Sequence, residues 1–332
     1  MKKGIKNCLG FGLLCLFILI CFSGLGMAKD PDYPTKPIEF VIGQTPGSTT
    51  DIASRALCDA VSKHLPQPFM PINKPGGGGA IAATIIKESK PDGYRVGILS
   101  RSPAFVTPFT QQVSYDPLRD FTPISYWGDD LDLVMVRGDS PWKTWKELVE
   151  WAKKHPGELK VGIPGPKLNQ SSGIVLGRIE LREKVKFIYV PFKGSLEVLT
   201  ALLGGNIDLY VSTMDAATED YLKMGKVRLL SYMGKNKLPG YENIPTTDEM
   251  YGITICNMIG VVGPKGLPPY VVKRLEEAFA KGVNDPAFVS VMKKMYTPIV
   301  HMNGQEMGRY MEQTYKEQKE AIELLMKEEG KK

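Results

Sequence analysis

The sequence predicts an α/β protein of two domains, and three features of the chain support this. Short apolar runs of strand length alternate with segments of helical periodicity, a pattern that favours a parallel-rich sheet. Residues 29–332, which follow an N-terminal export signal, are too many for one core of ordinary size. Two similar strand-to-helix loops occur, one in each half of the chain.

The export signal consists of three lysines, an apolar stretch over 9–22 and small residues before the expected cleavage point at Ala28. A transmembrane anchor is the first alternative, but the stretch is shorter than the ~20 residues that span a bilayer. Acylation at Cys21 is the second, although Ile20 stands where a small residue is expected. We therefore expect a periplasmic protein whose signal peptide, residues 1–28, is cleaved.

Composition excludes several classes of function. The signal carries three lysines and no acid, so its removal lowers the formal charge from +6 to +3, which predicts no nucleic-acid partner. Cys58 and Cys256 remain, either as a disulfide or as two buried thiols. The three histidines form no ligand pattern, and we expect neither a metal nor a cofactor.

The elements of the first half are separated by clear turns. The apolar run 38–42 predicts a strand, and apolar residues at helical spacing predict a helix from Asp51 onward. A strand at 69–72 and a helix at 80–89 follow, separated by the glycine-rich turn 73–79. Further strands are predicted at 95–99, 131–136, 161–163, 187–190, 207–211, 229–233 and 256–262. Further helices are predicted at 144–154, 172–181, 195–203, 269–283, 286–295 and 305–327.

The first loop that can bind a ligand, 45–51, lies between a strand and a helix. Ligands of open α/β sheets bind just beyond the carboxyl ends of the strands, and a helix N-terminus favours an anion. Ser48, Thr49 and Thr50 add hydroxyl groups without charge. The alternative is that Thr50 or Asp51 only caps the helix.

The second such loop, 162–172, offers polar side chains before a helix, and its alternative is a solvated loop. If the two loops face each other across a cleft, they can hold one small anion from both sides. The glycines 76–79 could cradle a phosphate, but they lack the spacing of a dinucleotide site, so we favour a turn.

No catalytic pattern is present: the chain lacks a Gly-x-Ser-x-Gly elbow and a His-Glu-x-x-His motif. Asp129, Asp130 and Asp132 form an acidic cluster, for which we favour a solvated turn over a metal site or a contact with a ligand ammonium. We therefore predict that the protein is not an enzyme.

Seven segments occur in order along the chain: Tyr33-Pro34-Thr35-Lys36-Pro37-Ile38, Pro46-Gly47-Ser48-Thr49-Thr50-Asp51, Asn73-Lys74-Pro75-Gly76-Gly77-Gly78-Gly79, Pro91-Asp92-Gly93-Tyr94, Tyr115-Asp116-Pro117-Leu118-Arg119-Asp120-Phe121, Val190-Pro191-Phe192-Lys193-Gly194-Ser195 and Leu202-Leu203-Gly204-Gly205. Together they resemble the substrate-binding proteins of the tripartite tricarboxylate transporters, also called the Bug (Bordetella uptake gene) family. The resemblance covers nearly all of the chain after the signal.

The resemblance implies a type II periplasmic-binding-protein fold, with two α/β domains and a ligand cleft between them. Domain 1 would comprise 29–130 and 255–332, and domain 2 would comprise 131–254. A small organic carboxylate would be the ligand, and large and small membrane subunits of a transporter would be the partners of a monomer. The alternative is a sensor that presents its closed form to a membrane receptor kinase.

The predicted ligand contacts come from both loops and from single positions beyond strands. Lys167 would add a full positive charge if it points into the cleft, and otherwise it points to water. Arg101 could pair with a ligand carboxylate or with a nearby acid. The predicted contacts are Gln44, Ser48, Thr49, Thr50, Asp51, Arg101, Lys167, Asn169, Gln170, Ser171, Lys193 and Ser212.

Overall fold

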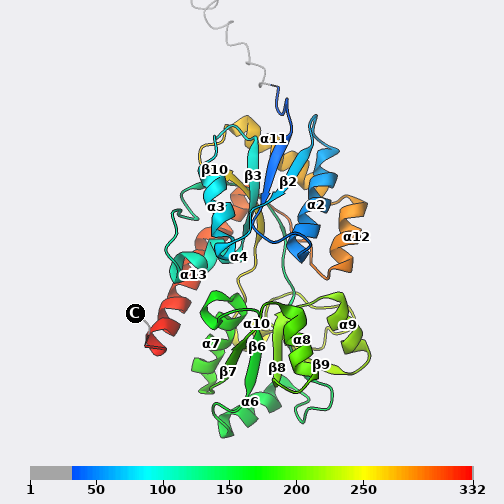
Figure 1. The fold of residues 1–332 in the computed structure, drawn as a ribbon, viewed down its shortest axis with the longest axis vertical. Helices are drawn as coiled ribbons and strands as arrows, with labels where there is room; N and C mark the ends of the chain where they lie inside the picture. The colour runs from blue at the N-terminus through cyan, green and yellow to red at the C-terminus, as the bar shows by residue number, and fades with distance from the viewer. Residues whose placement is uncertain (1–31, 331–332) are drawn as a thin grey trace, which may run out of the picture. The chain divides into compact units, whose positions relative to one another are not determined.

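The strands form two separate mixed sheets in a computed structural model that describes residues 32–330 (Figure 1). The predicted signal peptide lies outside the described residues, and all elements given below belong to one unit that begins at Pro34. Among the described residues, no helix combines the length and the apolar character needed to cross a membrane.

The six-stranded sheet has the order β11-β4-β10-β3-β1-β2. Its strands are β1 Ile38–Ile42, β2 Phe69–Asn73, β3 Arg95–Ser100, β4 Phe121–Gly128, β10 Ile259–Pro264 and β11 Met302–Asn303. β1 pairs in parallel with β2 and β3, whereas β10 runs antiparallel between β3 and β4. The sheet is thus assembled from two stretches of chain that are far apart in sequence.

The five-stranded sheet has the order β7-β6-β8-β5-β9 and comes from one continuous stretch. Its strands are β5 Asp132–Arg137, β6 Lys160–Ile163, β7 Ile188–Pro191, β8 Leu209–Thr213 and β9 Val227–Tyr232. β6 is parallel to β7 and β8, and β5 is antiparallel to β8 and β9. Consecutive residues of β5 point to opposite faces of the sheet. Leu133 belongs to an apolar cluster on one face, and Val134 belongs to a cluster on the other.

The sequence predicts a parallel-rich sheet, and this prediction is corrected: the structure has two mixed sheets. Parallel neighbours need a crossover, usually a helix, between consecutive strands. No helix separates β4 from β5, because the chain passes through 129–131 directly into the other sheet. It returns through 253–258, so β10 enters the six-stranded sheet in the opposite direction to β3.

Helices cover both sheets, and most begin and end within a few residues of the predicted positions. Around the six-stranded sheet these are α2 Thr49–Ser62, α3 Ala80–Lys87, α4 Arg101–Phe105, α5 Thr107–Thr110, α11 Pro269–Gly282, α12 Pro286–Lys294 and α13 Gly304–Glu328. Around the five-stranded sheet are α6 Trp145–Lys154, α7 Ser171–Glu183, α8 Ser195–Leu203, α9 Ala216–Lys223 and α10 Thr247–Tyr251. Two short 3₁₀ turns, η1 Gly77–Gly79 and η2 Lys167–Asn169, precede α3 and α7. The sequence did not predict β4, β11, α4, α5, α9 or α10.

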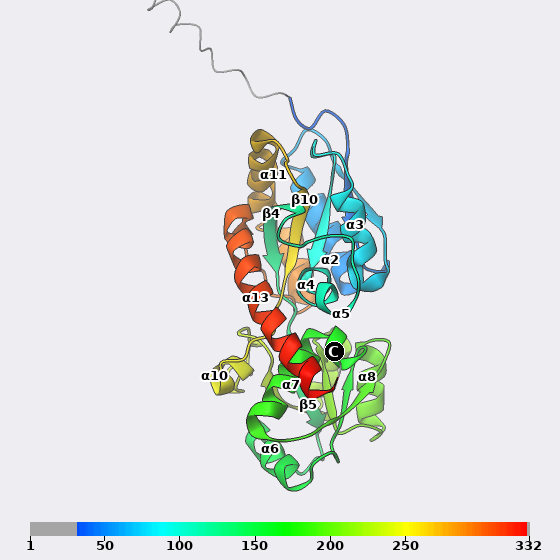
Figure 2. The ribbon, with the colours of Figure 1, turned by 90° about the vertical axis from the view of Figure 1, so that its left-hand side faces the viewer.

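The last helix, α13, reaches from one sheet to the helices of the other (Figure 2). A capping box between Asn303 and Glu306 begins it. Met307, near its start, is buried in the core of the six-stranded sheet. Leu325, near its end, packs with Ile174 of α7. The helix is therefore fixed at both ends to different parts of the fold.

Candidate functional site

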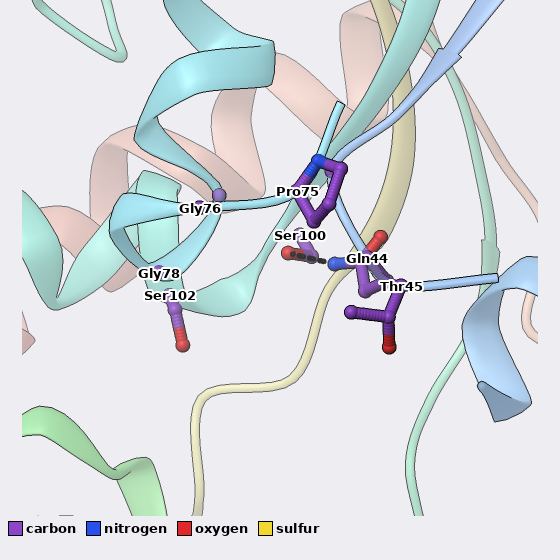
Figure 3. Close-up of a pocket in the computed structure, with 9 residues that line it drawn as sticks. Gln44, Thr45, Pro75, Gly76, Gly78, Ser100 and Ser102 are labelled. Atoms are coloured by element: carbon purple, nitrogen blue, oxygen red, sulfur yellow. Dashed lines mark hydrogen bonds between the residues drawn. The ribbon is translucent and has the colours of Figure 1, made fainter. Parts of the chain in front are cut away.

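The carboxyl ends of β1, β2 and β3 surround a pocket of about 300 Å³ (Figure 3). These three strands are parallel neighbours, so the loops that follow them meet at one edge of the sheet, where open α/β sheets bind ligands. The lining residues are Gly43, Gln44, Thr45, Pro75, Gly76, Gly78, Gly79, Ser100 and Ser102. None of them carries a charged side chain.

The glycine turn 76–79 forms one wall of this pocket. All four glycines have positive φ values between 57° and 129°, which L side chains adopt rarely. A Cβ at Gly79 would also lie 3.0 Å from Pro103 Cγ, so α4 packs directly on the turn. The predicted turn is present, and it additionally lines the pocket, a role that the spacing of the glycines did not indicate.

Gln44 is the one predicted contact among the lining residues. Its Nε2 donates to Ser100 Oγ at 3.1 Å, which joins the loop after β1 to the end of β3 (Figure 3). Its Oε1 is buried and has no hydrogen-bond partner among the described residues. Ser100, the last residue of β3, and Ser102, just beyond it, are absent from the predicted contacts; the neighbour of β3 in the sheet is β1. Knowledge that β3 pairs with β1 would have placed both serines beside the loop that follows β1.

Asp51 holds the first loop in place through three hydrogen bonds. Its carboxylate is 4 % exposed and accepts from Gly47 N at 2.8 Å, Asn73 Nδ2 at 2.7 Å and Arg55 Nε at 3.0 Å. Burial alone would raise the pKa of Asp51, but these hydrogen bonds outweigh burial and lower the pKa. The carboxylate is thus held by the loop, by β2 and by α2, and a ligand contact from Asp51 stays a prediction.

The cap of α2 is Ser48, not Thr50 or Asp51: Ser48 Oγ accepts from Asp51 N at 3.3 Å. Thr49 is exposed and Thr50 is half-buried in the first turn of α2. Ligand contacts from these three residues stay predictions.

Lys167 lies in a different place from the one expected of a ligand-binding lysine. Its Nζ is 2.7 Å from Glu180 Oε2 and 3.2 Å from Glu329 Oε1, and it lies 4.5 Å from the centre of the Tyr189 ring. Its charge is thus compensated by two carboxylates. In this structure Lys167 is therefore neither a free charge nor a side chain that points only to water.

The remaining residues of the second loop lie at the start of α7. Asn169 and Gln170 are half-buried, and the Gln170 amide is folded close over Gly165. Ser171 is buried, with its Oγ 3.2 Å from Cys256 Sγ. Their ligand contacts stay predictions.

Two single positions complete the predicted set. Lys193 is exposed after β7, and its backbone N–H donates to Glu197. Ser212 is buried in β8, paired in register with Leu133.

Both cysteines of the described chain, Cys58 and Cys256, are buried free thiols, which decides between the two alternatives of the sequence. Burial raises the pKa of the Cys256 thiol to about 11, so the thiol stays protonated and unreactive near neutral pH.

Arg101 joins the two sheets through an ion pair. It follows β3, and its Nη1 is 2.7 Å from Asp132 Oδ2 at the start of β5 and 3.7 Å from Asp130 Oδ2. Nη1 also donates to Asn257 Oδ1 at 3.0 Å, in the returning segment. Of the two predicted partners, the structure therefore shows the nearby acid. The acidic cluster is likewise not a solvated turn, since Asp132 is 3 % exposed.

Asp129, beside this ion pair, makes stability depend on pH. Its burial, together with the nearby Asp130, raises its pKa to about 6, although hydrogen bonds from Tyr126 and Asn236 oppose the change. Because this pKa exceeds the ordinary value of 3.8, the stabilising contribution of the protonated group is complete below pH 3.8 and is lost as the pH rises through 6.

Asp129→Asn should therefore gain stability relative to the wild type as the pH rises. The free energy of unfolding of the variant minus that of the wild type is expected to be about 2 kcal/mol larger at pH 7 than at pH 4. Urea unfolding at the two pH values measures this difference. Asp139→Asn, at a side chain that is 69 % exposed, is the matched control. An equal Asp129→Asn effect at both pH values would contradict the assignment.

The structure has two mixed sheets covered by helices, two segments that cross between them and a polar pocket at strand ends. Together these features define a solute-binding protein of the periplasmic-binding type. The sequence matches the model of the tripartite tricarboxylate transporter family receptor over residues 53–326, and the chain belongs to this family. This is a family of receptors, not of enzymes. The match confirms the resemblance seen in the seven sequence segments.

Individual relatives agree with this membership. A protein in the gbd 5′ region of Cupriavidus necator is 34% identical over 311 residues, 91% of this chain and 93% of the relative. A solved TctC solute-binding protein from Polaromonas has a TM-score of 0.76 at 30% identity, covering 88% of this chain and 99% of that one. The periplasmic binding protein BugD has a TM-score of 0.69 at 25% identity, covering 88% and 98%.

Proposed function

We propose that this chain is a periplasmic solute-binding protein that captures a small organic acid and delivers it to the large and small membrane subunits of a transporter. The observation that supports this most directly is the neutral, polar pocket at the ends of β1, β2 and β3. Its volume of about 300 Å³ suits a small molecule. Hydroxyl groups and backbone N–H groups bind a carboxylate through charge-assisted hydrogen bonds without a cation.

The second loop would supply the opposite side of the site. α7 begins at Ser171, and an N-terminus of a helix this long attracts anions. Asn169, Gln170 and Ser171 would donate from there once the two domains close. We propose that closure occurs by bending at 129–131 and 253–258, with the domains 29–130 plus 255–332 and 131–254.

A thermal-shift screen of organic acids tests the binding function. Adipate and malate are the first compounds, because two proteins that share the fold, at 24% and 22% identity, were solved with them. A bound acid is expected to raise the melting temperature with concentration, by the equivalent of about 2.7 kcal/mol at 100 times its Kd.

Two matched serine variants serve as controls for this screen. Ser102→Ala, in the pocket lining, is expected to reduce the shift, whereas Ser114→Ala, outside that lining, leaves it unchanged. If no acid in a broad panel shifts the melting temperature, the proposal fails.

A further inference from the structure

Lys167 connects two consecutive elements, η2 of the second loop and α7, to the distant end of α13. It is the first residue of η2 in the second loop, Glu180 belongs to α7, and Glu329 directly follows α13. The three side chains are 18 %, 11 % and 26 % exposed, so the ion pairs are partly shielded from water. Partial burial makes such pairs stronger than fully exposed ones.

Glu180 is itself held rigidly. Its Oε1 accepts from Phe187 N at 2.7 Å, and its Oε2 accepts from Tyr189 Oη at 2.9 Å in addition to Lys167 Nζ. The carboxylate is thereby fixed to β7 and to the segment before it. Lys167 consequently has a defined position relative to the five-stranded sheet.

Apolar packing runs beside the ion pairs. Leu168, the next residue of η2, shares a buried cluster with Ile174 of α7 and with Ile322 and Leu325 of α13. Gly177 allows this close approach, since a Cβ there would lie 2.8 Å from Leu325 Cδ2 and 3.2 Å from Lys167 Cε. The end of α13 therefore contacts the loop through charge and through apolar surface.

The start of α13 is fixed just as firmly to the six-stranded sheet. A Cβ at Gly304 would lie 2.4 Å from the carbonyl oxygen of Pro123 in β4, so the helix begins in direct contact with that strand. In the described structure, α13 thus links the second loop to the six-stranded sheet.

We propose that Lys167 and Glu329 are positioning residues, which fix the second loop to α13 without touching the solute. This inference rests on the proposed function where it concerns affinity, since Asn169, Gln170 and Ser171 follow Lys167 directly. The pair sets the place from which those three residues donate, and so the solute affinity depends on a contact outside the pocket.

Hydrogen exchange of the full chain without added solute tests the positioning directly. Asn169 N, Gln170 N and Ile174 N donate to backbone carbonyls of this region, so a peptide covering 167–176 reports its order. Glu329→Gln is expected to speed exchange in that peptide about fivefold, equivalent to about 1 kcal/mol, and to leave a peptide covering β1 unchanged. Lys167→Ala is expected to act in the same way, and Lys167→Arg to retain protection.

The matched control is Glu323→Gln, which carries the same substitution on α13 in an exposed pair with Lys319. It is expected to leave the peptide 167–176 unchanged. Gly177→Ala provides a second, uncharged variant: the new Cβ displaces Leu325, and exchange should rise in the same peptide.

Wild-type exchange in 167–176 for both Glu329→Gln and Gly177→Ala would overturn the inference, as would faster exchange spread evenly over all peptides. A failed acid screen with the expected exchange pattern would refute the solute-binding function alone. The two ideas therefore fail separately.

Discussion

Replacing Arg101 with methionine is expected to lower the free energy of unfolding by about 3–5 kcal/mol. The substitution removes the only guanidinium that contacts Asp132 within the described chain, and the Asp132 side chain is 2 % exposed. Although burial would lower the pKa of Arg101, the carboxylates of Asp132 and Asp130 raise it, which shows how strongly the site favours the charged form. Without it, two carboxylates face each other at the junction of the sheets.

Urea unfolding followed by tryptophan fluorescence measures the effect. Arg101→Lys should lose less, because an ammonium keeps the charge but not the paired geometry with Asp132. The double variant Arg101→Met with Asp132→Leu should recover much of the loss, since breaking a buried pair costs more than replacing both partners. A loss below about 1 kcal/mol for Arg101→Met would mean that water reaches the carboxylates.

Asp51→Ala is expected to cost about 2–3 kcal/mol at pH 7, because it removes the charged acceptor of three part-buried hydrogen bonds, from Gly47, Asn73 and Arg55. The pKa of Asp51 is lowered, so its contribution is present above the ordinary value of 3.8 and is lost as the pH falls through the lower pKa of the folded state. The cost of the substitution should therefore shrink in acid.

Unfolding of the wild type and the variant at pH 7 and near pH 3 provides this comparison. Asp59→Ala, at an exposed position of the same helix, is the control and should cost little at either pH. An Asp51→Ala cost that is independent of pH would contradict the assigned role of the carboxylate.

Local sequence patterns predict a helix or strand well where the segment has a single clear periodicity or apolar run. The apolar run at β1 and the spacing in α8 gave bounds that match the structure. β4 was missed because Pro123 interrupts a pattern that otherwise reads as a strand, and the strand is completed by pairing with β10, more than 130 residues later. Pairing between distant segments is invisible to a local window.

The candidate site was predictable only in part, for the same reason. The loop after β1 is identified from its own residues, but the pocket also needs the turn after β2 and the serines at the end of β3 and beyond it, which adjoin the loop only in the folded sheet. The sequence predicts Lys167 and Arg101 as ligand contacts, and in the structure both are ion-paired. Their partners Glu329 and Asp132 lie 162 and 31 positions away, and sequence spacing gives no indication of either contact.

The position of β10 between β3 and β4 in the six-stranded sheet has a consequence for folding. β10 pairs with β3 on one side and with β4 on the other, yet it follows them in the chain by more than 130 residues. Until residues 259–264 are available, β3 and β4 each present an unpaired edge that can join strands of other molecules. Contacts between such distant residues also form slowly. A chain that folds from its N-terminus is therefore most prone to aggregate after β4 has formed and before β10 is available, which is when chaperones should bind it most strongly.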